Sequence, residues 1–439
     1  MNNRHLQDPL TGMGNRQSLM AALQVRLDAI RHSDQQAALL LVDGGRLKKI
    51  NDAQGMAVGD QVILQIAQRL QGFAGSSWVV ARLHADTFAC FLENPGSTED
   101  ALDQAKVLLE FLAAPVVADA ESVPLCPRMG MAFYPRDAAT PADLLQAAEY
   151  ALQGAKKSFL TPCQQFDFSQ YEVQKRHLKI EKALYELMDQ GVVRQLELYY
   201  QPKICLQNRC VVSSEALLRW QHPQLGSISP AEFIPLVEGT SLGVRLDRWV
   251  LSQVSEQLAC WVRQGVSFPQ VAVNLSTAQL TQEDFPEWLA ARMQYLNLPP
   301  ACLQLEITEG AMISNDQMAF DLLHRLQHLG FSLALDDFGT GYSSLSYLSK
   351  LPLDELKIDR SFIMQIAHCG RSLKLLESIV ALARNLELEL VIEGVETAEQ
   401  LELLQPLGAM KIQGYYFYRP MKASDFTGLL SDSTSLMFF

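Results

Sequence analysis

Apolar runs alternate with amphipathic stretches along all 439 residues, and the rhythm of this alternation differs between two parts of the chain. In the first 160 residues, four short apolar runs are separated by stretches with helical spacing. The predicted strands are residues 37–43, 78–83, 87–93 and 129–135, and the predicted helices are residues 17–31, 60–70, 98–112 and 142–157. A β-α-β-β-α-β order of this kind predicts a small α/β domain in which helices cover one face of a sheet.

The second part alternates short apolar runs with longer helical patterns from about residue 196 onward. Its predicted strands are residues 196–202, 211–220, 270–276, 303–309, 332–338, 355–360, 389–396 and 411–417. Eight strands with intervening helices are what a closed, TIM-like (β/α)8 barrel needs. We therefore expect a first domain over residues 1–160, a linker over 161–175 and a barrel over 176–439.

Composition limits the class of protein. Hydrophobic residues make up 48% of the chain and charged residues 19%, which is typical of globular proteins. The net charge of −13 argues against a nucleic-acid partner, because phosphates need basic surfaces. No apolar run is as long as a membrane span, and the polar start of the sequence lacks the apolar core of a secretory signal. We expect a cytoplasmic protein, and eight cysteines without a CxxC pair suit a reducing compartment.

The stretch LALDDFGTGYSSL, residues 333–345, contains two adjacent acids at the end of a predicted strand. Neighbouring side chains of a strand point to opposite faces, so Asp336 and Asp337 can serve one site only where the pleat breaks. The glycine-rich sequence that follows is consistent with such a break. The stretch therefore predicts a strand that ends in a pocket suited to cations.

Every predicted strand of the second part carries a polar group late in its run or just after it. These groups are Gln201, Glu215 with Arg219, Asn274, Glu306, Asp336 with Asp337, Lys357 with Asp359, Glu393 and Gln413. In a barrel, the carboxyl ends of the strands form the rim that holds catalytic groups. A single acid at such a place more often caps the next helix, but capping does not explain crowded carboxylates beside Arg, Lys, Asn and Gln. All-oxygen ligands favour a site for Mg²⁺ or Mn²⁺, with two ions.

The motif EALLRW at residues 215–220 resembles the signature of the EAL family of cyclic di-GMP phosphodiesterases. The likeness continues, in the order and spacing of the family, through YQP, SPAEFIPLVE, NLS, LEITE, DDFGTGYSSLSYL, LKIDRSF, IEGVET and QGYYFYRP. It covers roughly residues 175–425.

The resemblance implies a role for each matching position. Glu215, Asn274, Glu306 and Asp336 match the ligands of a first metal ion, and Asp336 bridges to a second ion that Asp337 and Glu393 also hold. Lys357 matches the lysine that orients or activates the attacking water. The remaining matches are Asp359, which supports the site, Gln201 and Arg219, which contact the substrate, Gln413, which lies near the bound water and phosphate, and Glu309, which anchors the loop DFGTGYSS.

The first part resembles the GGDEF family of diguanylate cyclases over about residues 7–168. Matching positions are Asp43 and Asp86 as metal ligands, Asn51 and Asp60 as guanine contacts, and Lys156 as a phosphate contact. The defining Gly-Gly-Asp/Glu-Glu-Phe turn is replaced by HADTF, residues 84–88, which lacks both glycines and the second acid. Leu160 replaces a phosphate-binding arginine, and Gly75 and Trp78 stand at the ends of the missing RxxD inhibition motif.

The leading hypothesis is a metal-dependent phosphodiesterase that hydrolyses cyclic di-GMP to linear 5′-pGpG. Its degenerate cyclase domain would have a regulatory or dimerising role, GTP binding there is left open, and a homodimer is expected from the resemblance. One alternative is a catalytically silent cyclic di-GMP receptor that acts through protein contacts. A second alternative is a bifunctional enzyme that also makes cyclic di-GMP, against which the HADTF turn argues.

Overall fold

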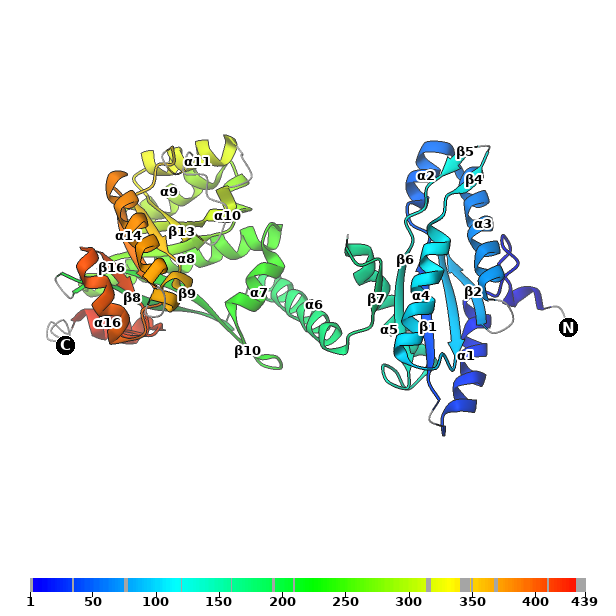
Figure 1. The fold of residues 1–439 in the computed structure, drawn as a ribbon. Coiled ribbons are helices and arrows are strands. Elements are labelled where there is room, and N and C mark those ends of the chain that lie inside the picture. Colours follow the sequence, from blue (N-terminus) through cyan, green and yellow to red (C-terminus); the bar gives the residue numbers. More distant parts are fainter. Residues whose placement is uncertain are drawn as a thin grey trace. The chain divides into compact units, whose positions relative to one another are not determined.

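The computed structural model describes most of the chain. It covers residues 3–33, 35–74, 78–119, 121–158, 160–191, 194–207, 210–312, 317–339, 348, 350–366, 370–408 and 410–431. The chain forms two compact units, Met1–Arg176 and His177–Phe439 (Figure 1). No helix among the described residues has the length and apolar character needed to cross a membrane.

The first unit is built on a five-stranded sheet with the order β2-β3-β1-β6-β7 (Figure 1). Its strands are β1 (Ala37–Asp43), β2 (Trp78–His84), β3 (Thr87–Glu93), β6 (Arg128–Tyr134) and β7 (Cys163–Gln165), beside a separate hairpin of β4 (Val116–Ala118) and β5 (Glu121–Val123). Its helices are η1 (Asn3–Leu6), α1 (Arg16–Ile30), α2 (Leu47–Gln54), α3 (Met56–Ala74), α4 (Thr98–Ala113) and α5 (Pro141–Lys157). Strand β1 is antiparallel to β3 and β6, and only the pair β6–β7 is parallel among the described strands of this sheet.

Helices cover both faces of this sheet, so the expectation of one covered face is wrong. All seven residues of β1 are buried. Leu40 and Val42 belong to an apolar cluster that includes residues of α3 and α4, whereas Leu39 and Leu41 belong to a second cluster with α1 and α5. The continuous apolar run AALLLV is typical of a strand that is buried on both sides.

Residues 161–175, expected as a linker, contain regular structure. Strand β7 pairs in parallel with β6, and helix α6 (Phe168–Asp189) begins within this stretch. An aromatic cluster of Tyr150, Phe166 and Tyr171 packs the start of α6 against α5, with ring centroids 5.2–5.8 Å apart. The domain boundaries given above stay a prediction.

The second unit is a closed barrel of eight strands, as predicted. In spatial order they are β9 (Cys210–His222), β11 (Gln270–Leu275), β12 (Leu303–Thr308), β13 (Ser332–Phe338), β14 (Glu355–Ile358), β15 (Glu389–Glu393), β16 (Lys411–Gln413) and β8 (Leu196–Cys205). The barrel closes because β8 pairs with both β9 and β16. Two short strands, β10 (Gly226–Ile228) and β17 (Met421–Lys422), extend the pairing at β9 and β8.

Helices follow most barrel strands (Figure 1). They are α7 (Pro230–Val237), α8 (Ser241–Gln264), η2 (Gln279–Thr281), α9 (Phe285–Tyr295), η3 (Pro300–Cys302), α10 (Glu309–Met312), α11 (Gln317–His328), α13 (Arg360–Ile366), α14 (Gly370–Asn385), α15 (Ala398–Leu404), η4 (Gln405–Leu407) and α16 (Ala423–Ser431). The C-terminal helix α16 packs on the first strand, since the rings of Phe426 and Tyr200 stack with centroids 5.8 Å apart.

Strand β8 departs from the predicted pattern. It is antiparallel to both of its neighbours, whereas the other seven barrel strands are parallel to one another in sequence around the barrel. The strand also continues to Cys205, so Gln201 lies within it rather than at its carboxyl end. Gln201 nevertheless reaches the same level as the other polar groups, because it pairs directly with Glu215 of β9.

Candidate metal centre

Four carboxylates from four strands surround the ammonium group of Lys357 on β14. Its Nζ lies 2.7 Å from Glu306 Oε2, 2.8 Å from Glu393 Oε1, 3.0 Å from Asp336 Oδ2 and 3.8 Å from Glu215 Oε2. The lysine and Glu306 are almost completely buried. The structure therefore brings together five of the residues that the sequence placed at strand ends.

Side-chain amides hold Glu215 from both sides. Asn274 Nδ2 donates to Glu215 Oε1 at 2.7 Å, and Gln413 Nε2 donates to Glu215 Oε2 at 2.6 Å. Gln413 Nε2 also lies 3.2 Å from the Oε1 atom of Gln201, whose own amide donates to the carbonyl of Tyr418. Asn274 is exposed, whereas Gln201, Glu215 and Gln413 are buried, so solvent reaches the cluster on the side of Asn274.

The loop after Asn274 is fixed by an acid of helix α8. Asp247 accepts hydrogen bonds from the backbone N–H and the hydroxyl of Ser276, at 3.1 and 2.6 Å. Burial raises the pKa of Asp247 to about 6, and the two hydrogen bonds from Ser276 oppose this shift. These two hydrogen bonds fix the position of Ser276, two residues after Asn274, which is a candidate metal ligand.

The backbone at Asp336 and Asp337 departs from regular strand geometry. The register between β13 and β14 shifts between Leu335 and Phe338, and Asp337 adopts a left-handed conformation with φ of +56°. Such a conformation is uncommon for a residue other than glycine and breaks the alternation of the pleat. Asp336 is buried beside Lys357, and the N–H of Asp337 donates to Asp336 Oδ1 at 2.9 Å.

Burial and charge act in opposite directions on these acids. Burial would raise the pKa of Glu306, but the ammonium groups of Lys203 and Lys357 outweigh it and lower that pKa to about 2. For Glu393, burial outweighs the attraction of Lys357 and raises the pKa to about 8. Burial likewise raises the pKa of Glu215 and of Asp336, against the opposing effect of Lys357.

The donor set fits a hard divalent cation. Glu215, Glu306 and Asp336 each offer an oxygen, and these oxygens lie within 4.8 Å of one another. Glu393 offers a further carboxylate beside them, Asn274 contacts Glu215 through its amide Nδ2 atom, and the set contains no sulfur or imidazole ligand. The negative charge of these four carboxylates, three of them buried, exceeds the positive charge of the ammonium group of Lys357 that they share. A bound cation would relieve their repulsion. These residues could therefore hold Mg²⁺ or Mn²⁺.

Three predicted residues lie outside this cluster of contacts. The guanidinium group of Arg219 donates to the carbonyl of Leu218 at 2.8 Å and lies over the ring of Tyr199. Asp359 Oδ1 accepts from the N–H of Ser361 at 2.9 Å, which is the helix-capping role that a single acid often has. Glu309 Oε2 accepts from the N–H of Gly339 at 3.0 Å, and most of the predicted loop DFGTGYSS lies outside the described residues.

The sequence reasoning missed a set of charged residues inside the barrel. Lys203 Nζ contacts Glu306 Oε1 at 2.7 Å and Glu355 Oε1 at 3.1 Å, and Lys411 Nζ lies 2.6 Å from Glu355 Oε2. The sequence does contain a pattern that indicates these residues. In several mostly apolar strands, two polar residues are separated by one position, so both lie on the same face of the strand. These pairs are Gln201 with Lys203, Gln304 with Glu306, and Glu355 with Lys357.

In the first unit, three of the five predicted nucleotide-site residues lie close together. Lys156 of α5 forms an ion pair with Asp43 at the end of β1. Asp86 is half-buried, and its burial and the charge of Asp43 raise its pKa. The Oδ1 atom of Asn51 on α2 is buried without a hydrogen-bond partner, and Asp60 on α3 is exposed.

The HADTF turn keeps a backbone that favours glycine. Ala85 has φ of +43°, in the left-handed region, and Arg82 donates two hydrogen bonds to its carbonyl at 3.0 and 2.8 Å. Thr87, which stands where the family has a second acid, is buried. Leu160 is 92% exposed, and Gly75 lies outside the described residues.

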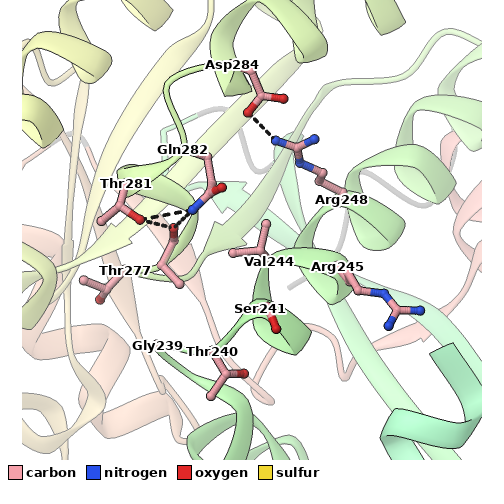
Figure 2. A pocket seen from close by; sticks show the side chains of 11 residues that line it. Gly239, Thr240, Ser241, Val244, Arg245, Arg248, Thr277, Thr281, Gln282 and Asp284 are labelled. Atoms are coloured by element: carbon pink, nitrogen blue, oxygen red, sulfur yellow. Dashed lines mark hydrogen bonds and ion pairs between the residues drawn. The ribbon is translucent and has the colours of Figure 1, made fainter. Parts of the chain in front are cut away.

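Each unit also contains a cavity. The one in the barrel unit, of about 640 Å³, is lined by the start of α8 and by the segment from Thr277 to Asp284, and Figure 2 shows Arg248 reaching Asp284 across it, at 2.7 Å. The one in the first unit, of about 430 Å³, includes His84, Lys156 and Tyr171 among its lining residues.

Comparisons with known proteins agree with this organisation. Residues 182–420 match the model of the EAL domain family, and residues 5–159 match that of the diguanylate cyclase GGDEF domain family. The chain is 35% identical, over 95% of its length, to the bifunctional diguanylate cyclase/cyclic di-GMP phosphodiesterase MucR of Pseudomonas aeruginosa. It is 34% identical, over 94% of its length, to the cyclic di-GMP phosphodiesterase NbdA of the same organism.

These relatives are longer proteins, since the chain spans 60% of the length of MucR and 52% of the length of NbdA. Among solved structures, the PaMucR phosphodiesterase in complex with c-di-GMP is 41% identical to this chain, with a TM-score of 0.52. The match covers 56% of this chain and 99% of that one.

Proposed function

Because the chain belongs to the EAL domain family and gathers the acids of its barrel around Lys357, we propose that it is a metal-dependent cyclic di-GMP phosphodiesterase. Its product would be linear 5′-pGpG. The observation that supports this proposal most strongly is the buried oxygen cluster of Glu215, Glu306 and Asp336.

In the proposed reaction, the oxygen of a water molecule bonds to phosphorus, the P–O3′ bond breaks and a proton ends on the 3′ oxygen. Two bound Mg²⁺ or Mn²⁺ ions would polarise the phosphate and lower the pKa of the attacking water. Glu215, Asn274 and Glu306 would hold one ion, Asp337 and Glu393 would hold the other, and Asp336 would bridge them. Gln201, Arg219 and Gln413 would contact the substrate, and Asp359 would support the site.

Lys357 has a role that follows from its charge. Burial would lower its pKa, but the four surrounding carboxylates raise that pKa well above its ordinary value. The group therefore keeps its proton and donates hydrogen bonds. We assign Lys357 to orienting the attacking water and balancing negative charge, rather than to accepting a proton as a general base.

We also propose that the first unit does not make cyclic di-GMP and instead has a regulatory or dimerising role. Thr87 supplies no carboxylate beside Asp86, and Ala85 places a methyl group in the turn where the family has glycine. GTP binding at Asp43, Asn51, Asp60, Asp86 and Lys156 would be the regulatory input. A cytoplasmic homodimer stays a prediction.

The test is incubation of the purified chain with cyclic di-GMP and Mn²⁺, followed by separation of linear and cyclic dinucleotides. We expect 5′-pGpG from the wild type and none from Glu215→Gln. A folded, Mn²⁺-loaded wild type that binds cyclic di-GMP without turnover would overturn the enzyme proposal and favour the receptor alternative. Incubation with GTP tests the first unit, and formation of cyclic di-GMP would contradict its assigned inactivity.

A further inference from the structure

Below the rim, the barrel interior carries alternating charges that continue from the candidate metal centre. We call this set the interior ion row, and it consists of Lys357, Glu306, Lys203, Glu355 and Lys411. Lys203, Glu306 and Glu355 have no exposed side-chain surface. The interior of such a barrel is ordinarily filled by branched apolar side chains. Replacing buried ion pairs by well-packed apolar residues is often neutral or stabilising. Stability alone therefore does not explain the interior ion row, and we look for a functional role.

Lys203 is the member of this row that joins the site to the interior. Its Nζ contacts three acceptors, Glu306 Oε1 at 2.7 Å, Glu355 Oε1 at 3.1 Å and Gln304 Oε1 at 3.5 Å. The other oxygen of Glu306 accepts from Lys357 at 2.7 Å. Both oxygens of Glu306 are therefore held in place by ammonium groups on opposite sides.

We propose that Lys203 is a positioning residue that fixes Glu306 in the orientation required for cation binding. This inference rests on the proposed metal-dependent function. Residues that hydrogen-bond a metal ligand from behind fix its orientation, and their loss typically weakens metal affinity about 10–100-fold. In this interpretation, Glu355 balances the charge of Lys203 through its Oε1 atom. The Nζ atom of Lys411 contacts the other oxygen of Glu355, Oε2.

A simpler account is that Lys203 only neutralises Glu355 inside the barrel. Two variants separate these roles. Lys203→Met leaves Glu355 with one partner and should lower the melting temperature. The double variant Lys203→Met/Glu355→Gln removes both charges, so it should recover much of that loss while Glu306 still lacks its second ammonium group.

The measurement is calorimetric Mn²⁺ binding to the full chain without substrate, together with thermal unfolding. We expect about 10–100-fold weaker Mn²⁺ binding in both variants, although the double variant is the more stable of the two. Lys411→Met is the matched control, because Lys411 contacts Glu355 but not Glu306, and its Mn²⁺ affinity should stay within about twofold of the wild type.

Recovery of wild-type Mn²⁺ affinity in the double variant would overturn the inference, since Lys203 would then act only through Glu355. The proposed function fails in a different way, namely when wild-type chain that binds Mn²⁺ does not hydrolyse cyclic di-GMP. The two failures are therefore distinguishable.

A separate observation concerns two cysteines at the connection between β8 and β9. Cys205 of β8 and Cys210 of β9 are direct partners in the antiparallel register. Both carry free thiols and are partly exposed. Directly opposed residues of antiparallel strands have Cα atoms about 4.5–5.5 Å apart, which lies within the range that a disulfide spans.

We infer that Cys205 and Cys210 form a reversible intrachain disulfide under mild oxidation by hydrogen peroxide. The peroxide oxidises one thiol to a sulfenic acid with release of water. The second thiol attacks this sulfur, and a second water molecule leaves as the disulfide forms. A dithiol reductant returns both thiols by exchange. Partial exposure favours such reversibility, because exposed disulfides are the more easily reduced ones.

The sequence allows a direct test in the full chain. Trypsin cleaves after Lys203, Arg209 and Arg219, so the disulfide would join peptides 204–209 and 210–219. After peroxide treatment and alkylation, we expect the joined peptides in mass spectrometry, their separation by dithiothreitol, and their absence from Cys205→Ser. Recovery of both peptides as separate alkylated or over-oxidised forms would overturn the inference.

Discussion

Replacement of Lys357 by methionine tests the electrostatics of the site most fully. The substitution removes an ammonium group that lies within 3.8 Å of all four acids, Glu215, Glu306, Asp336 and Glu393. Methionine fills a similar volume, so the main change is the loss of positive charge. Glu306 keeps its contact with Lys203, whereas the other three acids lose the nearest cation.

Removing one partner of a buried ion pair typically costs about 3–5 kcal/mol of unfolding free energy. For a unit of this size, we expect the melting temperature in EDTA to fall by roughly 6–20 °C. The loss should grow with pH. Burial already raises the pKa values of Glu215, Asp336 and Glu393, and loss of the lysine raises them further. The folded state then holds protons that the unfolded state releases, so its stability falls as pH rises from about 5 to above 8.

Added Mn²⁺ should reverse this effect, because the cations replace the missing positive charge. At 100 times its dissociation constant, a ligand adds about 2.7 kcal/mol to the stability of the folded state. We expect Lys357→Met to gain at least as much from Mn²⁺ as the wild type while losing phosphodiesterase activity. The assay is thermal unfolding at pH 6 and pH 8.5, with EDTA and with Mn²⁺.

Lys182→Met is the matched control, since Lys182 is 77% exposed and lies 3.7 Å from Glu186. Exposed pairs of this kind contribute less than about 1 kcal/mol. A melting temperature of Lys357→Met within about 2 °C of the wild type in EDTA at pH 8.5, a shift worth under about 1 kcal/mol, would contradict this role of Lys357.

Three further predictions concern Glu393, Gly394 and Ala85. Because the pKa of Glu393 is about 8, Mn²⁺ competes with a proton for this carboxylate. The Mn²⁺ affinity of the chain should therefore fall about tenfold per pH unit below pH 8, and an unchanged Mn²⁺ affinity at pH 6 would contradict this. Gly394→Ala should lower phosphodiesterase activity and reduce the free energy of unfolding by about 1–3 kcal/mol. The reason is that the φ angle of Gly394 is +72° and the new Cβ atom would lie 2.2 Å from Arg360 Cβ. A fully active variant would contradict this geometry. Ala85→Gly should raise stability in denaturant by roughly 0.5–1 kcal/mol by relieving the left-handed backbone, yet yield no cyclase activity from GTP.

The sequence predicts most of the barrel but not the direction of its first strand. Apolar periodicity locates strands and says nothing about their direction. The short connection between β8 and β9 was the missed signal, since Cys205 and Cys210 leave only residues 206–209 for the turn. A parallel crossover needs a dozen or more residues, so a connection this short requires an antiparallel pair. Likewise, the fully apolar AALLLV run already favoured a sheet covered on both faces.

Much of the site was predictable because charged residues at the ends of apolar strands contribute little to a core and gather at one rim once the barrel closes. The proximity of Glu215, Glu306 and Asp336 follows from their positions at this rim. The ion pairs that Lys203 forms inside the barrel were not predicted, because a lysine near the end of a strand is ordinarily expected to be exposed. Its burial depends on Glu355 of a distant strand, and that pairing is a property of the closed barrel.

Anomalous diffraction at the manganese edge, from crystals of the chain grown with Mn²⁺, tests directly whether the rim carboxylates bind metal ions. We expect strong peaks at the rim, with oxygens of Glu215, Glu306 and Asp336 at bonding distances of about 2.0–2.2 Å. Peaks confined to the protein surface, with none among these three carboxylates, would contradict it.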